Sequence, residues 1–158
     1  MLIRFAIRDV SIAGVTAFLW WAFAEHSAGT GIAADLAGWL VGTMLFVCAY
    51  LAHEWSHFLG AVAMGSRVEV GQRLASGFLF SFPAEGNGLA QFVVMSLAGF
   101  AATGLAIGLC YGVLPDAYLA SRVARGGALF LGLLGLVLEL PLLLYGVATR
   151  SVPTQAAV

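Results

Sequence analysis

Two of the three histidines in this chain stand four residues apart, at His53 and His57, and Glu54 directly follows the first. On an α-helix, positions i and i+4 lie on one face, one turn apart, so both imidazoles can reach a single metal ion. A glutamate after the first ligand is placed to act as general base on a water at that metal. The spacing therefore predicts a metal site; the alternative is a histidine pair that only hydrogen-bonds to neighbouring helices.

A catalytic zinc ion takes three protein ligands and keeps one position open, so a third ligand must come from another segment. Glu139 is the one acidic residue inside the other expected apolar helices. If the histidine helix leaves the membrane near Met64, its two histidines lie about 10–16 Å from that end, and Glu139 lies about 15 Å from the same side. We expect Glu139 to complete a His₂Glu zinc site. The alternatives are that it pairs with an arginine or with helix backbone, or that it stays protonated.

The amino-acid composition indicates which class of protein contains this site. The chain has 158 residues, of which 61% are hydrophobic and 9% charged, and its mean hydropathy is +0.98. So few charges cannot cover a water-facing surface, which excludes a soluble globular protein, and the same values exclude disorder. The formal net charge of −1 and the scattered arginines argue against a nucleic-acid partner.

The sequence therefore predicts an all-α integral membrane protein that forms a single domain, residues 1–158. Transmembrane helices need about 20 mostly apolar residues, and we expect four, at about 10–24, 36–64, 89–114 and 126–149. Five arginines fall on the side of the chain termini, and Arg122 and Arg125 fall on the other. By the positive-inside rule, both termini are expected in the cytoplasm.

The segment between the second and third expected helices, residues 66–82, differs from the rest. Its two parts, Arg67–Val70 and Gly77–Phe82, are rich in β-branched and aromatic residues and are separated by glycines. This pattern predicts a small β-hairpin at the membrane face; the alternative is an irregular interfacial loop.

These features together resemble the site-2 protease family of intramembrane zinc metalloproteases, over about residues 36–149. The His-Glu-x-x-His motif is followed by a small residue, Ala61, and then by a glycine, Gly65, and the β-prone segment. The stretch Ala98–Thr103 is similar to the family's Ala-Gly-Pro-x-x-Asn pattern, with Phe100 and Thr103 in place of proline and asparagine. Pro141 and Gly146 fit the last motif, but Tyr145 stands where the family has its zinc-binding aspartate.

The resemblance implies hydrolysis of peptide bonds in membrane-embedded substrates, with Zn²⁺ bound by His53, His57 and Glu139, the last replacing the missing aspartate. Glu54 would be the general base, and Thr103 would hydrogen-bond to the developing oxyanion. The strands within 66–82 would hold an unwound substrate by edge pairing. Such a protein would lie in the lipid bilayer of a bacterial cytoplasmic membrane. Because the aspartate is missing, the alternative is a catalytically silent accessory subunit of a membrane complex, whose partners are the other subunits.

Overall fold

The computed structural model describes residues 1–153; the last five residues of the predicted domain, 154–158, lie outside the described residues. Helix α1 spans Leu2–Phe23, and a short 3₁₀ turn, η1, spans Glu25–Ala28. The elements that follow are α2 (Ile32–Ala63), β1 (Glu69–Val70), β2 (Phe80–Ser81), α3 (Leu89–Gly112), α4 (Leu119–Leu134), the π-helical turn η2 (Gly135–Glu139) and α5 (Leu140–Thr149).

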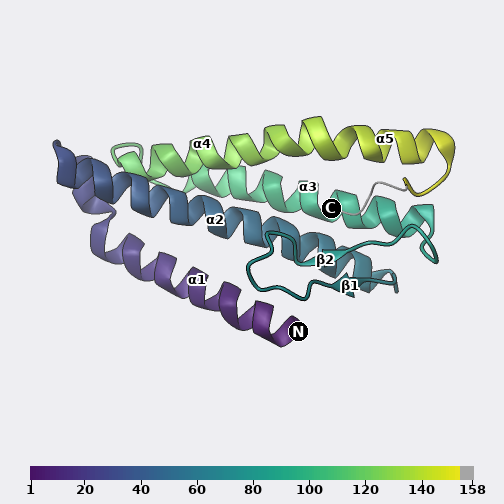
Figure 1. Ribbon diagram of the computed structural model, residues 1–158. Coiled ribbons are helices and arrows are strands. Elements are labelled where there is room, and N and C mark those ends of the chain that lie inside the picture. The colour runs from purple at the N-terminus through teal and green to yellow at the C-terminus, as the bar shows by residue number, and fades with distance from the viewer. Residues whose placement is uncertain (154–158) are drawn as a thin grey trace.

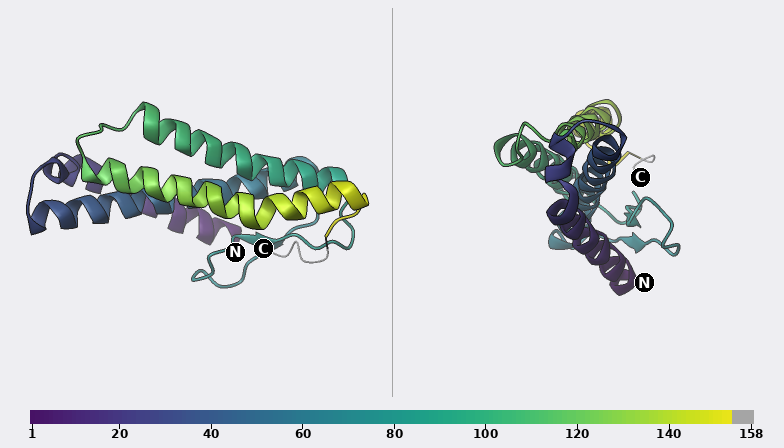
Figure 2. Two further views of the ribbon diagram at one scale, coloured as in Figure 1. Left: turned by 90° about the horizontal axis from the view of Figure 1, so that it is seen from above. Right: turned by 90° about the vertical axis from the view of Figure 1, so that its left-hand side faces the viewer.

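Three long helical rods lie side by side: α2, α3 and the continuous α4–η2–α5 (Figures 1 and 2). Helix α1 crosses α2 at an angle, and the hairpin covers one end of the bundle (Figure 1). The start of α1 and the end of α5 both lie at this hairpin end. Because α2 runs toward the hairpin, α3 away from it and α4–α5 toward it again, the three rods alternate in direction.

The three rods, Ile32–Ala63, Leu89–Gly112 and Leu119–Thr149, are each long and apolar enough to cross a membrane. Many of their large apolar side chains are more than half exposed, such as Leu36, Leu105 and Leu133. Apolar surface of this extent suits contact with lipid better than contact with water. The helical character and the membrane-protein class predicted from the sequence both agree with this structure.

Helix α1 is not among these three, so the fourth span stays a prediction. Its first nine residues include Arg4, Arg8 and Asp9. The charge-free part that follows, from Val10 to Phe23, is shorter than the about 20 residues that a span requires.

The third rod starts earlier in the chain than predicted, at Leu119 instead of about residue 126. The predicted span began after Arg122 and Arg125, which were counted with the loop on the side opposite to the termini. In the structure, Arg125 donates hydrogen bonds to the carbonyl oxygens of Cys110 (3.0 Å) and Leu114 (2.6 Å) and pairs with Asp116. These partners satisfy both the guanidinium and the free carbonyls at the end of α3, so the helix can include the arginine.

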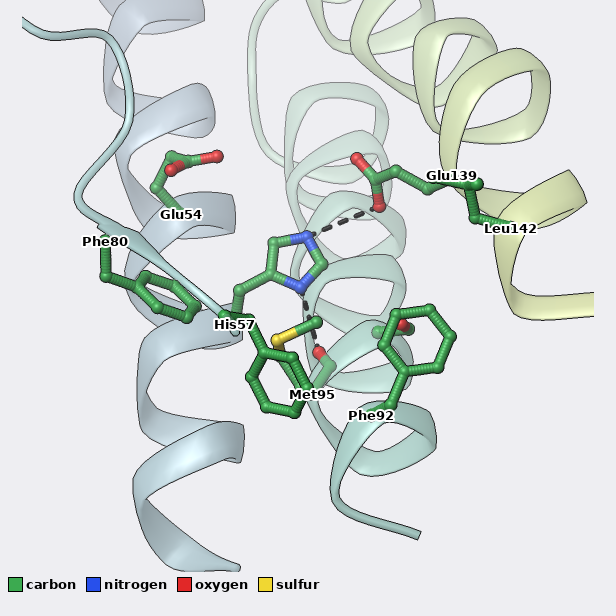
Figure 3. A pocket seen from close by; sticks show the side chains of 9 residues that line it. Glu54, His57, Phe80, Phe92, Met95, Glu139 and Leu142 are labelled. Atoms are coloured by element: carbon green, nitrogen blue, oxygen red, sulfur yellow. Dashed lines mark hydrogen bonds and ion pairs between the residues drawn. The ribbon is translucent and has the colours of Figure 1, made fainter. Parts of the chain in front are cut away.

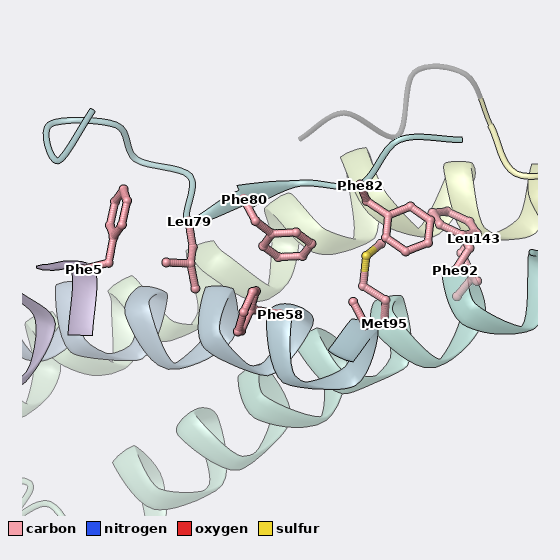
Figure 4. Packing of buried hydrophobic residues seen from close by; sticks show 9 residues of the cluster. Phe5, Phe58, Leu79, Phe80, Phe82, Phe92, Met95 and Leu143 are labelled. Atoms are coloured by element: carbon pink, nitrogen blue, oxygen red, sulfur yellow. The ribbon is translucent and has the colours of Figure 1, made fainter. Parts of the chain in front are cut away.

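The predicted β-hairpin is confirmed in its simplest form. β1 and β2 pair antiparallel, with Glu69 opposite Ser81 and Val70 opposite Phe80. The segment packs its apolar side chains onto the ends of the helices, where Phe80 lies against Phe58 with ring centroids 5.5 Å apart (Figure 4). The buried cluster at this end comprises Phe5, Phe58, Ala61, Leu79, Phe80, Phe82, Phe92, Met95 and Leu143. The main hydrophobic core thus lies under the hairpin rather than along the full length of the bundle.

An ion pair near the start of α1 links α1 to the hairpin loop and to the histidine helix. Asp9 is 8% exposed; its Oδ1 accepts a hydrogen bond from Arg8 Nε (2.6 Å), and its Oδ2 accepts one from Trp55 Nε1 (2.8 Å). The Arg8 guanidinium also donates to the carbonyl oxygens of Leu74 and Ser76. Since Trp55 lies between His53 and His57, this network reaches the turn of α2 that carries the two histidines.

We predict that Trp55→Phe lowers the free energy of unfolding by about 1–3 kcal/mol, because it leaves a buried carboxylate oxygen without its donor. Thermal unfolding of the detergent-solubilised protein measures the loss. The control is Trp21→Phe, the same substitution at a side chain that is 81% exposed. Equal unfolding midpoints for the two variants would contradict the stabilising role of the Asp9–Trp55 bond.

Candidate metal centre

The structure brings His53, His57 and Glu139 together, from two helical rods that are far apart in the sequence. His53 Nε2 lies 3.0 Å from His57 Nε2 and 3.1 Å from Glu139 Oε1, and His57 Nε2 lies 3.3 Å from Glu139 Oε2. The two imidazole rings are nearly perpendicular, at 87°. The three side chains lie close enough together to bind one metal ion.

Helix α3 fixes the orientation of both imidazoles through its backbone. His57 Nδ1 lies 2.9 Å from the carbonyl oxygen of Met95, and His53 Nδ1 lies 3.1 Å from that of Gly99. Gly99 also makes room for the site, because a Cβ at this position would come within 2.2 Å of His57 Cε1. Any larger residue at position 99 would push the His57 ring out of the cluster.

These contacts determine which ring nitrogens carry hydrogen. A carbonyl oxygen can only accept, so each histidine carries a hydrogen on Nδ1, and in its neutral form it turns its Nε2 lone pair toward the other side chains. Two lone pairs and a carboxylate then face one another within 3.3 Å, which is repulsive unless positive charge lies between them. Glu139 Oε2 is buried and, among the described residues, has no hydrogen-bond donor.

A single metal cation could supply the positive charge that this arrangement needs. Two imidazolium rings 3.0 Å apart inside an apolar bundle would repel each other, whereas one cation satisfies all three acceptors at once. Ligand atoms about 2.0–2.1 Å from a tetrahedral zinc ion lie about 3.3 Å from one another. The three distances of 3.0, 3.1 and 3.3 Å are close to this value.

Glu139 is the last residue of the π-helical turn, and Pro141 follows two positions later. Proline lacks the N–H that would bond to the carbonyl of Val137, so the regular α-helical hydrogen-bond pattern is interrupted here. The Leu140 N–H instead bonds to the carbonyl of Gly135, one residue further back than in an α-helix. Turns of this kind rotate the side chains that follow and are frequent at functional sites. Tyr145, at the aspartate position of the resembled family, is 58% exposed and is not one of the three clustered residues.

Glu54 is 7% exposed and lines the same cavity as His57 and Glu139 (Figure 3). Its Oε2 accepts a hydrogen bond of 3.2 Å from the backbone N–H of Leu79, just before β2. The hairpin segment thereby orients the carboxylate that the sequence predicts to be the general base. Tyr50, one helical turn earlier, donates to the carbonyl of Gly77, which fixes the same segment a second time (2.7 Å).

Thr103 lies beside the cluster, but its hydroxyl is on the far side of the His53 ring. Its Oγ1 is 2.8 Å from His53 Nδ1, and the residue is 5% exposed. In this position the hydroxyl supports the orientation of a ligand. Its predicted contact with an oxyanion stays a prediction.

Sequence reasoning missed the groups that hold these residues in place. The carbonyls of Met95 and Gly99 and the N–H of Leu79 are backbone atoms, and no residue type signals their use. Asp9 directly precedes the first expected helix, at about residues 10–24, and the sequence reasoning assigned it no partner. The contact between Asp9 and Trp55 had one available signal in the sequence. Asp9 is an acidic residue next to a long apolar segment, and Trp55 is a tryptophan inside the His-Glu-x-x-His motif.

No protein-family model, curated protein or solved structure significantly matches this chain. The assignment of the site therefore rests on its own geometry.

We predict that the purified protein binds one Zn²⁺ per chain and that Glu139→Ala weakens binding by about 100-fold or more, because removal of even an outer partner costs 10–100-fold. Elemental analysis and competition with a chelator measure the change. Glu85→Ala, at an exposed carboxylate, is the control. Unchanged one-to-one binding in Glu139→Ala would remove Glu139 from the site.

Thr103→Val is expected to weaken zinc binding by about 10–100-fold while leaving the stoichiometry at one, because the His53 ring loses a partner that fixes its orientation. The same competition assay measures it, with Thr149→Val, at an exposed position, as the matched control. Equal zinc affinities in the two variants would show that the Gly99 carbonyl alone fixes the His53 ring.

Proposed function

We propose that this protein is a zinc-dependent intramembrane metalloprotease, which hydrolyses peptide bonds of membrane-embedded substrates. The observation that carries the proposal is the convergence of three side chains that could hold a metal ion. Two of them, His57 and Glu139, line one cavity together with the buried carboxylate of Glu54, between membrane-length helices. A metal site that only joined helices would need the three ligands but would have no use for Glu54.

Zinc at this position would supply a Lewis acid for the scissile carbonyl and activate a water. Glu54 would take the proton of that water and pass it to the leaving amine. The Leu79 N–H holds one carboxylate oxygen, which orients the other toward the reaction. His53 and His57 keep their geometry through the α3 backbone, so they need little rearrangement during the reaction.

A transmembrane substrate hides its carbonyls in its own helix and must unwind before it can be cut. The short hairpin beside Glu54 has only two strands, so each keeps an unpaired edge to which an extended substrate could pair. The resemblance to the site-2 protease family supports the same reaction. We place the protein in the cytoplasmic membrane of a bacterium, with α1 as a fourth span and both termini, together with the hairpin, on the cytoplasmic side. Arg67, Arg73 and Arg150 belong to this hairpin end and support that orientation.

One observation favours a second candidate function, a catalytically silent accessory subunit of a membrane complex. The Thr103 hydroxyl is bound to His53, whereas the resembled family has an asparagine there to stabilise the oxyanion. A site without that donor would bind zinc and still hydrolyse slowly or not at all.

We predict that Glu54→Gln lowers kcat for cleavage of single-span peptides by about 10²–10⁴-fold, the usual contribution of a general base, while one zinc ion per chain is retained. The assay uses purified protein in liposomes and a panel of single-span peptides.

Glu139→Ala, which is expected to lose the metal, is the inactive control. If zinc-loaded wild type and Glu54→Gln are equally inert toward every peptide, the accessory-subunit function replaces the protease.

A further inference from the structure

A small cavity lies directly beside the candidate metal centre, on the side of the hairpin (Figure 3). Its volume is about 50 Å³. Three of its polar wall residues are Glu54, His57 and Glu139, and its remaining wall is largely apolar. The apolar wall is made by Phe80, Phe82, Phe92, Met95 and Leu142.

The apolar wall comes from three separate elements that close around the site. Phe80 and Phe82 come from the hairpin segment, Phe92 and Met95 from the start of α3, and Leu142 from α5. The rings of Phe82 and Phe92 lie 6.2 Å apart, and both residues are no more than 3% exposed. A wall packed this tightly has a defined shape, so it can distinguish ligands by size.

The volume limits what can enter. On the usual scale of cavity volumes, one water needs about 10–15 Å³ and a cavity of about 150 Å³ accepts benzene. A space of about 50 Å³ therefore accommodates a branched group of a few carbon atoms and excludes an aromatic ring. Ser96 adds one hydroxyl to the wall, but the rest of the wall away from Glu54, His57 and Glu139 is apolar and favours an apolar group over water.

We propose that this cavity is a specificity pocket that receives a branched aliphatic side chain, of the valine or leucine class, from the substrate residue next to the scissile bond. The inference rests on the proposed protease function and adds the substrate preference. Because His57 and Glu139 belong to both the metal centre and the pocket wall, a side chain in the pocket must belong to a residue adjacent to the bond at the metal.

Leu142 is the best position for a test. It is only partly buried, unlike the phenylalanines, so changing it disturbs the core least. Leu142→Phe fills the pocket and Leu142→Ala enlarges it. The controls are Leu144→Phe and Leu144→Ala, on the same helix at a side chain that is 59% exposed and outside the pocket wall.

The experiment compares kcat/KM for single-span peptides that carry alanine, valine, leucine or phenylalanine next to the cleaved bond. Wild type is expected to favour valine or leucine over alanine and phenylalanine by about 10-fold or more, the usual effect of a misfitting group in an apolar pocket. Leu142→Phe should shift the preference to alanine by a similar factor, and Leu142→Ala should raise the relative rate for phenylalanine. Both Leu144 variants should keep the wild-type order.

A second measurement does not depend on catalysis. Hydroxamates of the same four amino acids bind zinc directly, and their stabilisation of the zinc-loaded protein against heat reports their affinities. The order of affinities should follow the order of cleavage and change in the same way in the Leu142 variants.

The outcomes separate the two proposals. Glu54-dependent cleavage with the same preference in wild type and both Leu142 variants overturns the specificity pocket and leaves the protease function intact. Absence of cleavage overturns the protease function; the hydroxamates then decide on the pocket, which is overturned if their order is the same in wild type and both Leu142 variants.

Discussion

The convergence of three proton-accepting atoms inside an apolar helical bundle is the constraint on which the rest of this structure depends. His53 and His57 turn their Nε2 lone pairs toward each other and toward Glu139, because the α3 backbone already uses their Nδ1 hydrogens. Such a group is stable only around positive charge, and a single divalent cation provides it with the least repulsion. The absence of a side chain at Gly99 and the π-helical turn before Pro141 make this convergence possible.

Apolar side chains pack differently at the hairpin end of the protein and along the rest of the helical bundle. Away from the hairpin the helices approach through small residues; a Cβ at Gly42, for example, would come within 2.7 Å of the Ala120 carbonyl oxygen. Their outer faces carry exposed leucines and valines, as lipid contact requires. Among the described residues, the buried aromatic core lies where the hairpin and α1 pack over the candidate metal centre. The hairpin therefore does more than connect α2 to α3, since it orients Glu54 and forms part of the wall of the cavity beside that centre.

Much of the site could be predicted because helix geometry is regular. The rise and rotation per residue place His53 and His57 on one face, and the same rise puts Glu139 at their depth. The strand pair was predictable from its β-branched and aromatic residues, and the lengths of α2 and α3 from their apolar runs. The seven residues by which α4 extends before the predicted span could not be foreseen, because the carbonyls that satisfy Arg125 come from the end of α3 and the loop after it. The partners of Asp9 and the contact of Thr103 with His53 depend on how helices cross, which no local pattern specifies.

The carboxylate of this site stands at position 139, whereas the site-2 protease family that the sequence resembles would have it at position 145. Tyr145 is six residues after Glu139, which on a regular helix is about 9 Å further along the axis and about 240° around it. A carboxylate at position 145 could not reach the same point without sliding and turning the whole rod against α2. The chain instead uses the longer side chain of glutamate together with a widened turn, so the rod keeps its contacts with Gly38, Gly42 and Phe46 of α2 while a carboxylate reaches the two histidines. The same rod thereby brings its carboxylate to the cavity wall that it shares with Glu54, which the Leu79 N–H holds from the hairpin side.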